Sequence, residues 1–153
     1  MSLANIRGEL KTVLEGVTGI GKVYDYLRYT KRQDSFFDLF KTSNSKIHAW
    51  QITRPATEEK SHNQNNSNLR RHNILIFGIY GLSDAAATEK TFQDLIESVC
   101  TALRTAGKQP SPLSGTALRM GPPQVNTVDY RRFGKVLSHG CDIKLCVDEY
   151  ISF

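Results

Sequence analysis

A stripe of apolar residues between positions 92 and 103 constrains the fold of this chain more than any other feature. Its members recur at spacings of three and four: Phe92, Leu95, Ile96, Val99, Cys100 and Leu103. This is the period of an amphipathic α-helix, which buries one side and leaves the other in water. We expect Ser83 or Asp84 to cap the helix and Gly107 and Pro110 to end it.

The segment before this helix, residues 69–81, is the strongest predicted strand. Its apolar run Ile74 to Phe77 indicates burial on both faces, which is typical of a central strand in a sheet. A second amphipathic helix is predicted over residues 3–17, where apolar residues again recur at spacings of three and four. Gly16 and Gly19 are expected to end it.

Shorter elements fill the rest of the N-terminal half. Residues 22–30 and 46–54 are predicted strands, and Pro55 is expected to end the second. A short helix capped by Asp34 is predicted between them. Its core face would carry the phenylalanines Phe36, Phe37 and Phe40.

The C-terminal part reads as a β-hairpin of residues 124–133 and 135–150 turning about Gly134. In its second strand apolar and polar residues alternate, which predicts one covered and one open face. The alternation slips at His139-Gly140, where we expect a bulge. The acidic pair Asp148-Glu149 is expected to form a solvated strand end.

These elements predict one α+β domain over residues 1–153. Its mostly antiparallel, mixed sheet would have about five strands, with the two main helices packed on one face. Two long flexible loops are expected, at residues 55–68, which are polar, and at 107–123, which are rich in Gly and Pro. We expect residues 56–68 to become protected from hydrogen exchange only on assembly with partners.

One segment matches the start of a phosphate-binding loop, Gly16 to Lys22 in the pattern GxxxxGK. The residue after the lysine is Val23, so the hydroxyl that would reach a magnesium ion is absent. The predicted order is also helix then strand, the reverse of a nucleotide-binding loop. A helix end followed by a tight turn explains this segment better.

The cysteines and histidines do not form a recognisable metal or catalytic signature. His139 and Cys141 are two residues apart, but two ligands do not make a zinc site. A dyad of Cys141 with His139 or His72 would need an orienting acid that the sequence does not identify. Cys100 lies on the apolar helix stripe, where cysteine acts as a small hydrophobe. We therefore expect no enzyme activity, no metal, no cofactor and no small-molecule substrate.

The net charge of +5 comes from residues 1–71, since residues 72–153 are balanced. A basic half is compatible with nucleic acid or an acidic protein surface. The candidate subunit-interface or lumen residues are Lys60, Arg70, Arg71, Arg131 and Arg132. Three cysteines without a secretory signal favour reduced thiols in a cytosol, and no apolar run is long enough for a membrane helix.

The order of segments resembles a known family, the tail-terminator (tail-completion) proteins of long-tailed bacteriophages. These are related to the minor tail protein U type and to some head–tail connector proteins. The matching segments are ANIRGELKTVLEGVTGIGKVYDY, SFFDLF, KIHAWQITR, RRHNILIFGIYGLSDAAATEKTFQDLIESVCTALR and the terminal strand pair.

The resemblance implies a virion protein without enzymatic activity, assembled in the host cytoplasm into a ring, expected to be a hexamer. Such a ring sits on the last ring of tail-tube protein and offers a surface to the head–tail connector. DNA would pass through its lumen without sequence-specific contact. A head-side connector or neck protein of similar fold is the alternative within this class, and a nucleic-acid-binding module or a small hydrolase is the alternative outside it.

Overall fold

The structure is a computed structural model that describes residues 2–28, 38–42, 46–63, 66–83, 85–133 and 136–153. Its main elements, in chain order, are α1 (Leu3–Glu15), β1 (Lys22–Tyr24), β2 (His48–Asn63), β3 (Ser67–Gly81), α3 (Thr88–Gly107), β4 (Arg119–Met120), β5 (Gln124–Phe133) and β6 (Val136–Ser152).

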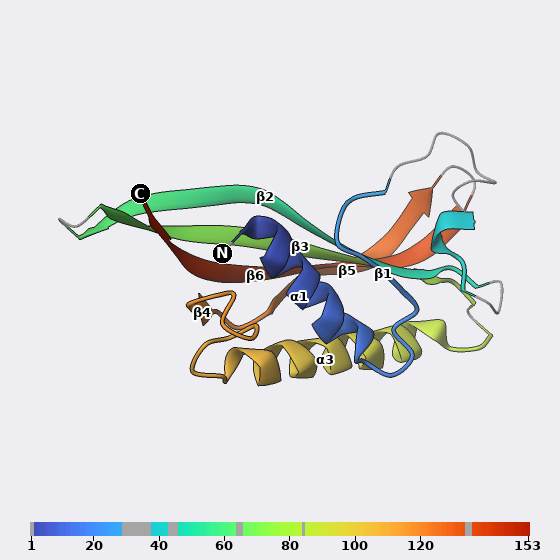
Figure 1. The fold of residues 1–153 in the computed structure, drawn as a ribbon. Coiled ribbons are helices and arrows are strands. Elements are labelled where there is room, and N and C mark those ends of the chain that lie inside the picture. The colour runs from blue at the N-terminus through green and yellow to red at the C-terminus, as the bar shows by residue number, and fades with distance from the viewer. Residues whose placement is uncertain (1, 29–37, 43–45, 64–65, 84, 134–135) are drawn as a thin grey trace.

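The strands form one mixed sheet in the order β1-β2-β3-β6-β4, with β5 also paired to β6. Only β1 pairs in parallel, and the other described pairs are antiparallel. Helices α1 and α3 pack on the same side of this sheet (Figure 1). The predicted α+β class, the central position of β3 and the two helices on one face are confirmed.

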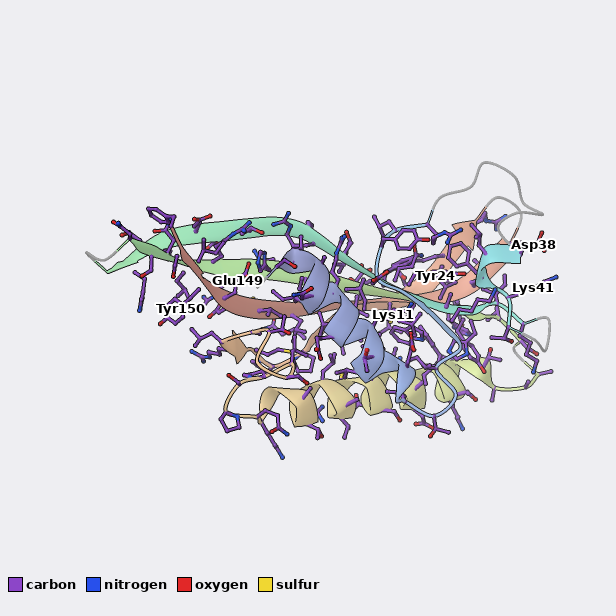
Figure 2. The ribbon with its side chains drawn as sticks, in the orientation of Figure 1. Lys11, Tyr24, Asp38, Lys41, Glu149 and Tyr150 are labelled. Atoms are coloured by element: carbon purple, nitrogen blue, oxygen red, sulfur yellow. The ribbon has the colours of Figure 1, made fainter. Side chains whose placement is uncertain are left out.

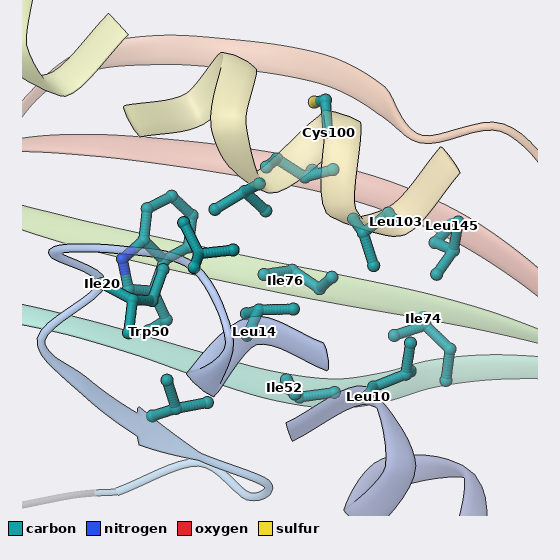
Figure 3. Packing of buried hydrophobic residues seen from close by; sticks show 14 of the residues in the cluster. Leu10, Leu14, Ile20, Trp50, Ile52, Ile74, Ile76, Cys100, Leu103 and Leu145 are labelled. Carbon is teal, nitrogen blue, oxygen red and sulfur yellow. The ribbon is translucent and has the colours of Figure 1, made fainter. Parts of the chain in front are cut away.

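The main core lies between the sheet and the two helices. Every residue of the predicted α3 stripe is buried, as are Ile6, Leu10 and Leu14 of α1. Figure 3 shows Leu10, Leu14 and Leu103 converging on Ile52, Ile74 and Ile76 of the sheet. Trp50 is fully buried beside Gly78, where an added Cβ would lie 2.6 Å from the indole ring. The glycine therefore makes room for the tryptophan.

A smaller apolar cluster lies on the other face of the sheet. It contains Phe40, Ile47, Ala49 and Ile79. The Tyr24 hydroxyl donates to the Leu39 carbonyl oxygen at 2.6 Å, which ties the segment at 38–42 to β1. Phe40 is in this core as predicted, whereas Asp34, Phe36 and Phe37 lie outside the described residues.

Strand β2 is much longer than the sequence indicated. It continues through Pro55 to Asn63 and pairs with β3 down to Ser67, so the predicted loop at residues 55–68 is wrong. A register shift between Thr53 and Ala56 accommodates the proline in the strand. Strand β1 is shorter than the predicted 22–30, since it ends at Tyr24.

Three further local predictions need correction. Ser83 does not cap α3: the N-cap residue is Ala87, in a left-handed conformation (φ 52°) with no side-chain cap, and Asp84 lies outside the described residues. Residues His139 and Gly140 pair regularly with both neighbouring strands, and the bulge lies in β5 between Val125 and Thr127. The segment at 107–123 is largely turns, as expected, but includes the last residue of α3 and the short β4.

Candidate assembly surfaces

A long arm of three strands extends the sheet beyond the two helices (Figure 1). We define this arm as residues 54–63 of β2, 67–73 of β3 and 147–152 of β6. Residues directly opposite each other in neighbouring strands share a face of the sheet. The two faces of the arm therefore carry different sets of polar side chains, which account for most of the predicted site residues.

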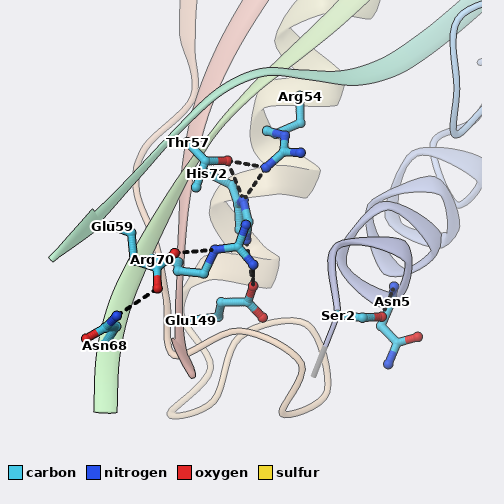
Figure 4. A network of polar contacts seen from close by, with 9 residues as sticks. All are labelled: Ser2, Asn5, Arg54, Thr57, Glu59, Asn68, Arg70, His72 and Glu149. Carbon is cyan, nitrogen blue, oxygen red and sulfur yellow. Dashed lines mark hydrogen bonds and ion pairs between the residues drawn. The ribbon is translucent and has the colours of Figure 1, made fainter. Parts of the chain in front are cut away.

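The helix-side face of the arm holds a buried polar cluster around His72 (Figure 4). His72 and Glu149 are both fully buried, and His72 Nε2 lies 2.7 Å from Glu149 Oε1. On the other side of the imidazole, Nδ1 lies 2.9 Å from the Thr57 hydroxyl, which also contacts Arg54. Arg54, 3.5 Å from Nδ1, can only donate hydrogen bonds, so Nδ1 is the acceptor and Nε2 carries the proton directed at Glu149.

Arg70 completes this cluster by lying between two carboxylates. Its guanidinium is 3.4 Å from Glu59 and 3.8 Å from Glu149. Glu149 Oε2 and Arg70 Nε are buried without a hydrogen-bond partner in the described structure. Since the side chains of His72 and Glu149 are fully buried, this pair is not accessible to a substrate. Its contacts stabilise the arm.

The opposite face of the arm is held by a second ion pair. Arg71 forms two parallel hydrogen bonds with Asp148, from Nε to Oδ1 at 2.8 Å and from Nη2 to Oδ2 at 3.0 Å. These hydrogen bonds and the nearby negative charge raise the pKa of Arg71. Asp148 and Glu149 are both buried, so the predicted solvated strand end is wrong.

The end of the arm carries an exposed aromatic contact. The Tyr150 hydroxyl lies 2.8 Å from His62 Nε2, and the two rings are 4.6 Å apart. Tyr150 stands near the tip of the arm, well away from α3 (Figure 2). The tip is thus tied across three strands by side chains that remain open to solvent.

The Arg131 side chain binds carboxylates of its own subunit. It hydrogen-bonds Asp129 at 2.7 Å and Asp142 at 3.0 Å, and its guanidinium stacks over Phe77. Although burial works against its charge, these hydrogen bonds raise the pKa of Arg131. Its side chain crosses Gly140, where an added Cβ would lie 2.4 Å from Arg131 Cδ.

The structure therefore divides the five predicted interface or lumen residues. Arg70, Arg71 and Arg131 pair with carboxylates of their own subunit. Lys60 and Arg132 are exposed, and neither forms an ion pair with any residue in the described ranges. Of the five predicted residues, only these two keep a positive charge that could pair with a carboxylate of a neighbouring subunit.

The cysteine and histidine residues considered as catalytic or metal-binding candidates do not form a solvent-accessible site. Cys141 is fully buried in the main core, and burial raises the pKa of its thiol to about 12, so it stays a protonated and weak nucleophile. His139 is buried against Phe92 and lies 2.8 Å from the Thr88 hydroxyl. Within the described ranges, no group of three His, Cys, Asp or Glu side chains is placed to hold a metal ion.

The glycine-rich segment after α1 is a turn, as expected. Gly19 and Gly21 have positive φ angles of 76° and 77°, and Lys22 Nζ donates to the Asp38 carbonyl oxygen at 3.2 Å. An added Cβ on Gly21 would lie 2.5 Å from the His48 carbonyl oxygen. This segment lets α1 turn closely onto the sheet.

A groove of about 500 Å³ lies on the face of the sheet that the helices leave open. Pro55, Leu75, Pro122, Lys144 and Cys146 are among its lining residues. Cys146 is exposed there and its thiol lies 3.3 Å from the Asn73 side-chain oxygen. The groove offers mixed apolar and polar contacts without a cluster of catalytic groups.

Comparison with known proteins yields a likeness of fold. No protein-family model matches the chain, and no curated protein sequence matches it. Among solved structures, the chain is similar to a chain from the virion of a native gene transfer agent particle, with a TM-score of 0.52 and 13% identity. That match covers 97% of this chain and 100% of the other. The whole domain thus shares its architecture with a virion component.

In the described part of the chain, no helix is both long enough and apolar enough to cross a membrane.

Proposed function

We propose that this chain is a structural protein of a phage-like virion that forms a ring, the tail terminator of a long-tailed particle. The observation that carries the proposal is the end-to-end likeness of fold to a chain of the gene transfer agent virion. At 13% identity the likeness concerns architecture, and the tail position comes from the family that the sequence resembles.

The surfaces of the subunit support an assembly role. Most of its candidate charged side chains are engaged in contacts inside the subunit, since His72, Arg70, Arg71 and Arg131 all contact carboxylates. The long polar arm projects beyond the two helices and offers contact area (Figure 1). Such a rigid domain with a projecting arm suits repeated contacts around a symmetric ring.

The proposed partners follow from this role. A ring, expected to contain six copies, would bind the last ring of tail-tube protein on one side and the connector on the other. DNA would pass through the lumen without sequence-specific contact, close to any uncompensated cations such as Lys60 and Arg132. The protein would act in the virion without catalysing a reaction or binding a cofactor.

The test is to mix the purified protein with isolated tail tubes and image the tubes by electron microscopy. The proposal expects one extra ring at one end of each tube and tubes that no longer elongate. A ring on the portal side of the head instead would favour the head-side connector. Binding to bare DNA that weakens steeply with salt would favour the nucleic-acid-binding module.

A further inference from the structure

The sheet has two long outer edges that none of the described strands covers. Strand β1 pairs with β2 only from Ala49 to Gln51, so β2 from Ile52 to Asn63 has a strand neighbour on one side alone. Strand β5, of 10 residues, pairs with β6 and with no other strand in the described ranges. Both edges present main-chain groups that a further strand can bind.

These edge strands are open to water on both faces as well. In β2, residues 58–62 are all exposed. In β5, Val125 and Tyr130 are 40% and 59% exposed although both residue types favour packed strands. A strand exposed on both faces gains little from packing, so it is held extended mainly by its hydrogen bonds to one neighbouring strand.

The devices that protect edges in monomeric proteins are sparse here. Monomers shorten their edge strands, interrupt them with proline or bulges, or point charges inward. Pro55 and the register shift beside it interrupt the beginning of the open β2 edge, and a second register shift lies near its end, between Ser61 and Asn63. The bulge in β5 lies near its start, between Val125 and Thr127. The stretches between and beyond these interruptions, residues 56–61 of β2 and 127–133 of β5, are regular and free to pair.

The directions of the strands fit one edge to the other. Because β2-β3, β3-β6 and β6-β5 are antiparallel pairs, β2 and β6 run one way while β3 and β5 run the other. Rotation about a ring axis preserves the sense of each strand along that axis. A β5 edge that pairs with the β2 edge of the next copy is therefore antiparallel to it.

Charges on the helix side of the sheet agree with this pairing. Glu59 lies opposite Arg70 on that side of β2, and its side chain is 42% exposed. Arg132 lies on the same side of β5, opposite Leu137, and forms no ion pair with a described residue. A carboxylate on one edge and a free guanidinium on the other favour contact between unlike edges over contact between like edges.

We propose that copies of this chain join through main-chain hydrogen bonds between the outer edge of β2 in one copy and the outer edge of β5 in the next. The sheet then continues from subunit to subunit around the assembly. The inference deepens the proposed function, since the closed form of this head-to-tail contact is the ring.

Hydrogen exchange of the free and the assembled protein tests this contact. The free protein is measured at low concentration, and the assembled protein at high concentration and on tail tubes. Edge pairing predicts that amides in residues 52–63 and in 124–133 exchange about tenfold or more slowly after assembly, because their outward N–H groups gain partners. Peptides from α3 serve as the internal control and keep their exchange rates.

Charge reversal adds a second readout. Arg132→Glu is expected to weaken assembly about tenfold, and combining it with Glu59→Lys is expected to restore part of the loss. Lys90→Glu, on the exposed side of α3, is the matched control and leaves assembly unchanged. Circular dichroism confirms that each variant is folded, since Glu59 also contacts Arg70.

The possible results distinguish a failure of the β2–β5 contact from a failure of the proposed ring. Rings whose two edges are both protected support the contact. Rings whose edges exchange as fast as in the free protein overturn the contact and leave the proposed function standing. Open filaments with protected edges support the contact and contradict the ring. Only monomers under every condition, tail tubes included, overturn both.

Discussion

His72 Nε2 lies 2.7 Å from Glu149 Oε1 in a fully buried contact between β3 and β6, at positions 77 residues apart in the sequence. The contact joins the middle strand of the arm to the C-terminal strand at the end of the apolar core, where Val147 lies opposite His72. Thr57 and Arg54 hold the other side of the imidazole. A buried polar cluster thus holds the strands of the arm together where the apolar core ends.

Removing this carboxylate is expected to destabilise the protein. Glu149→Ala leaves the His72 N–H and the Arg70 guanidinium without their buried partner, which costs about 2–4 kcal/mol of unfolding free energy. Glu149→Gln keeps an acceptor for the imidazole and is expected to lose less. Urea unfolding measures both, with Asp94→Ala on the exposed side of α3 as the control. A loss no larger than that of the control would contradict this role of Glu149.

Two glycines are expected to respond in opposite ways to alanine. At Gly78 a Cβ would lie 2.6 Å from the fully buried Trp50 ring, so Gly78→Ala should destabilise by about 2–3 kcal/mol. At Gly8, within α1, no atom lies within 4 Å of the added Cβ. Gly8→Ala should therefore stabilise by about 0.5–1 kcal/mol through helix propensity. Thermal unfolding of both variants checks the pair, and equal effects would contradict the packing described for Trp50.

The residue that precedes α3 adopts an unfavourable backbone conformation. Ala87 adopts φ 52° and ψ 43°, a left-handed conformation that glycine adopts more easily than alanine. Ala87→Gly is expected to stabilise the protein by about 0.5–1 kcal/mol. Ala85→Gly, in the turn just before it, is the comparison variant, and a gain of the same size there would refute the explanation.

His48 is expected to make the protein less stable in acid. Burial lowers its pKa from 6.5 to about 4, and its Nε2 accepts a hydrogen bond from the Trp50 indole, which requires the neutral ring. Above pH 6.5 the residue is neutral in both states and has no effect. As the pH falls from 6.5 to 4 the unfolded chain binds a proton that the folded protein excludes, so stability falls by on the order of 3 kcal/mol.

The measurement is urea unfolding of the wild type and of His48→Gln across that pH range. Carboxylates contribute to acid unfolding in both proteins, so the difference between them isolates the histidine. The difference in unfolding free energy between the two proteins should be constant above pH 6.5 and then shift in favour of the variant, by on the order of 3 kcal/mol, as the pH falls to 4. Parallel curves would show that His48 does not titrate as its burial requires.

Local patterns predicted the helices and the central strand because their apolar spacing has one physical explanation. The α3 stripe is buried at every predicted position, and β3 lies between β2 and β6. The extended β2 was missed because Pro55 and the polar residues after it lack any apolar alternation. That segment is extended because β3 supplies its hydrogen bonds, together with contacts such as Asn68 to Glu59 at 2.8 Å.

The polar clusters could not be predicted for a similar reason. Glu149 and Asp148 look like a solvated strand end until the sheet register places them beside His72 and Arg71. The register is a long-range property that one sequence does not display. The candidate residues Arg70, Arg71 and Arg131 were identified by their charge, but their partners within the same subunit were not.

The most direct test of the ring subunit is the mass of the purified protein, measured by light scattering alone and after mixing with tail tubes, with the tube ends imaged in the same samples. The account predicts a discrete closed oligomer, a hexamer in the proposed form, seated at one end of each tube. A protein that stays monomeric in the presence of tubes, and leaves their ends bare, would contradict it.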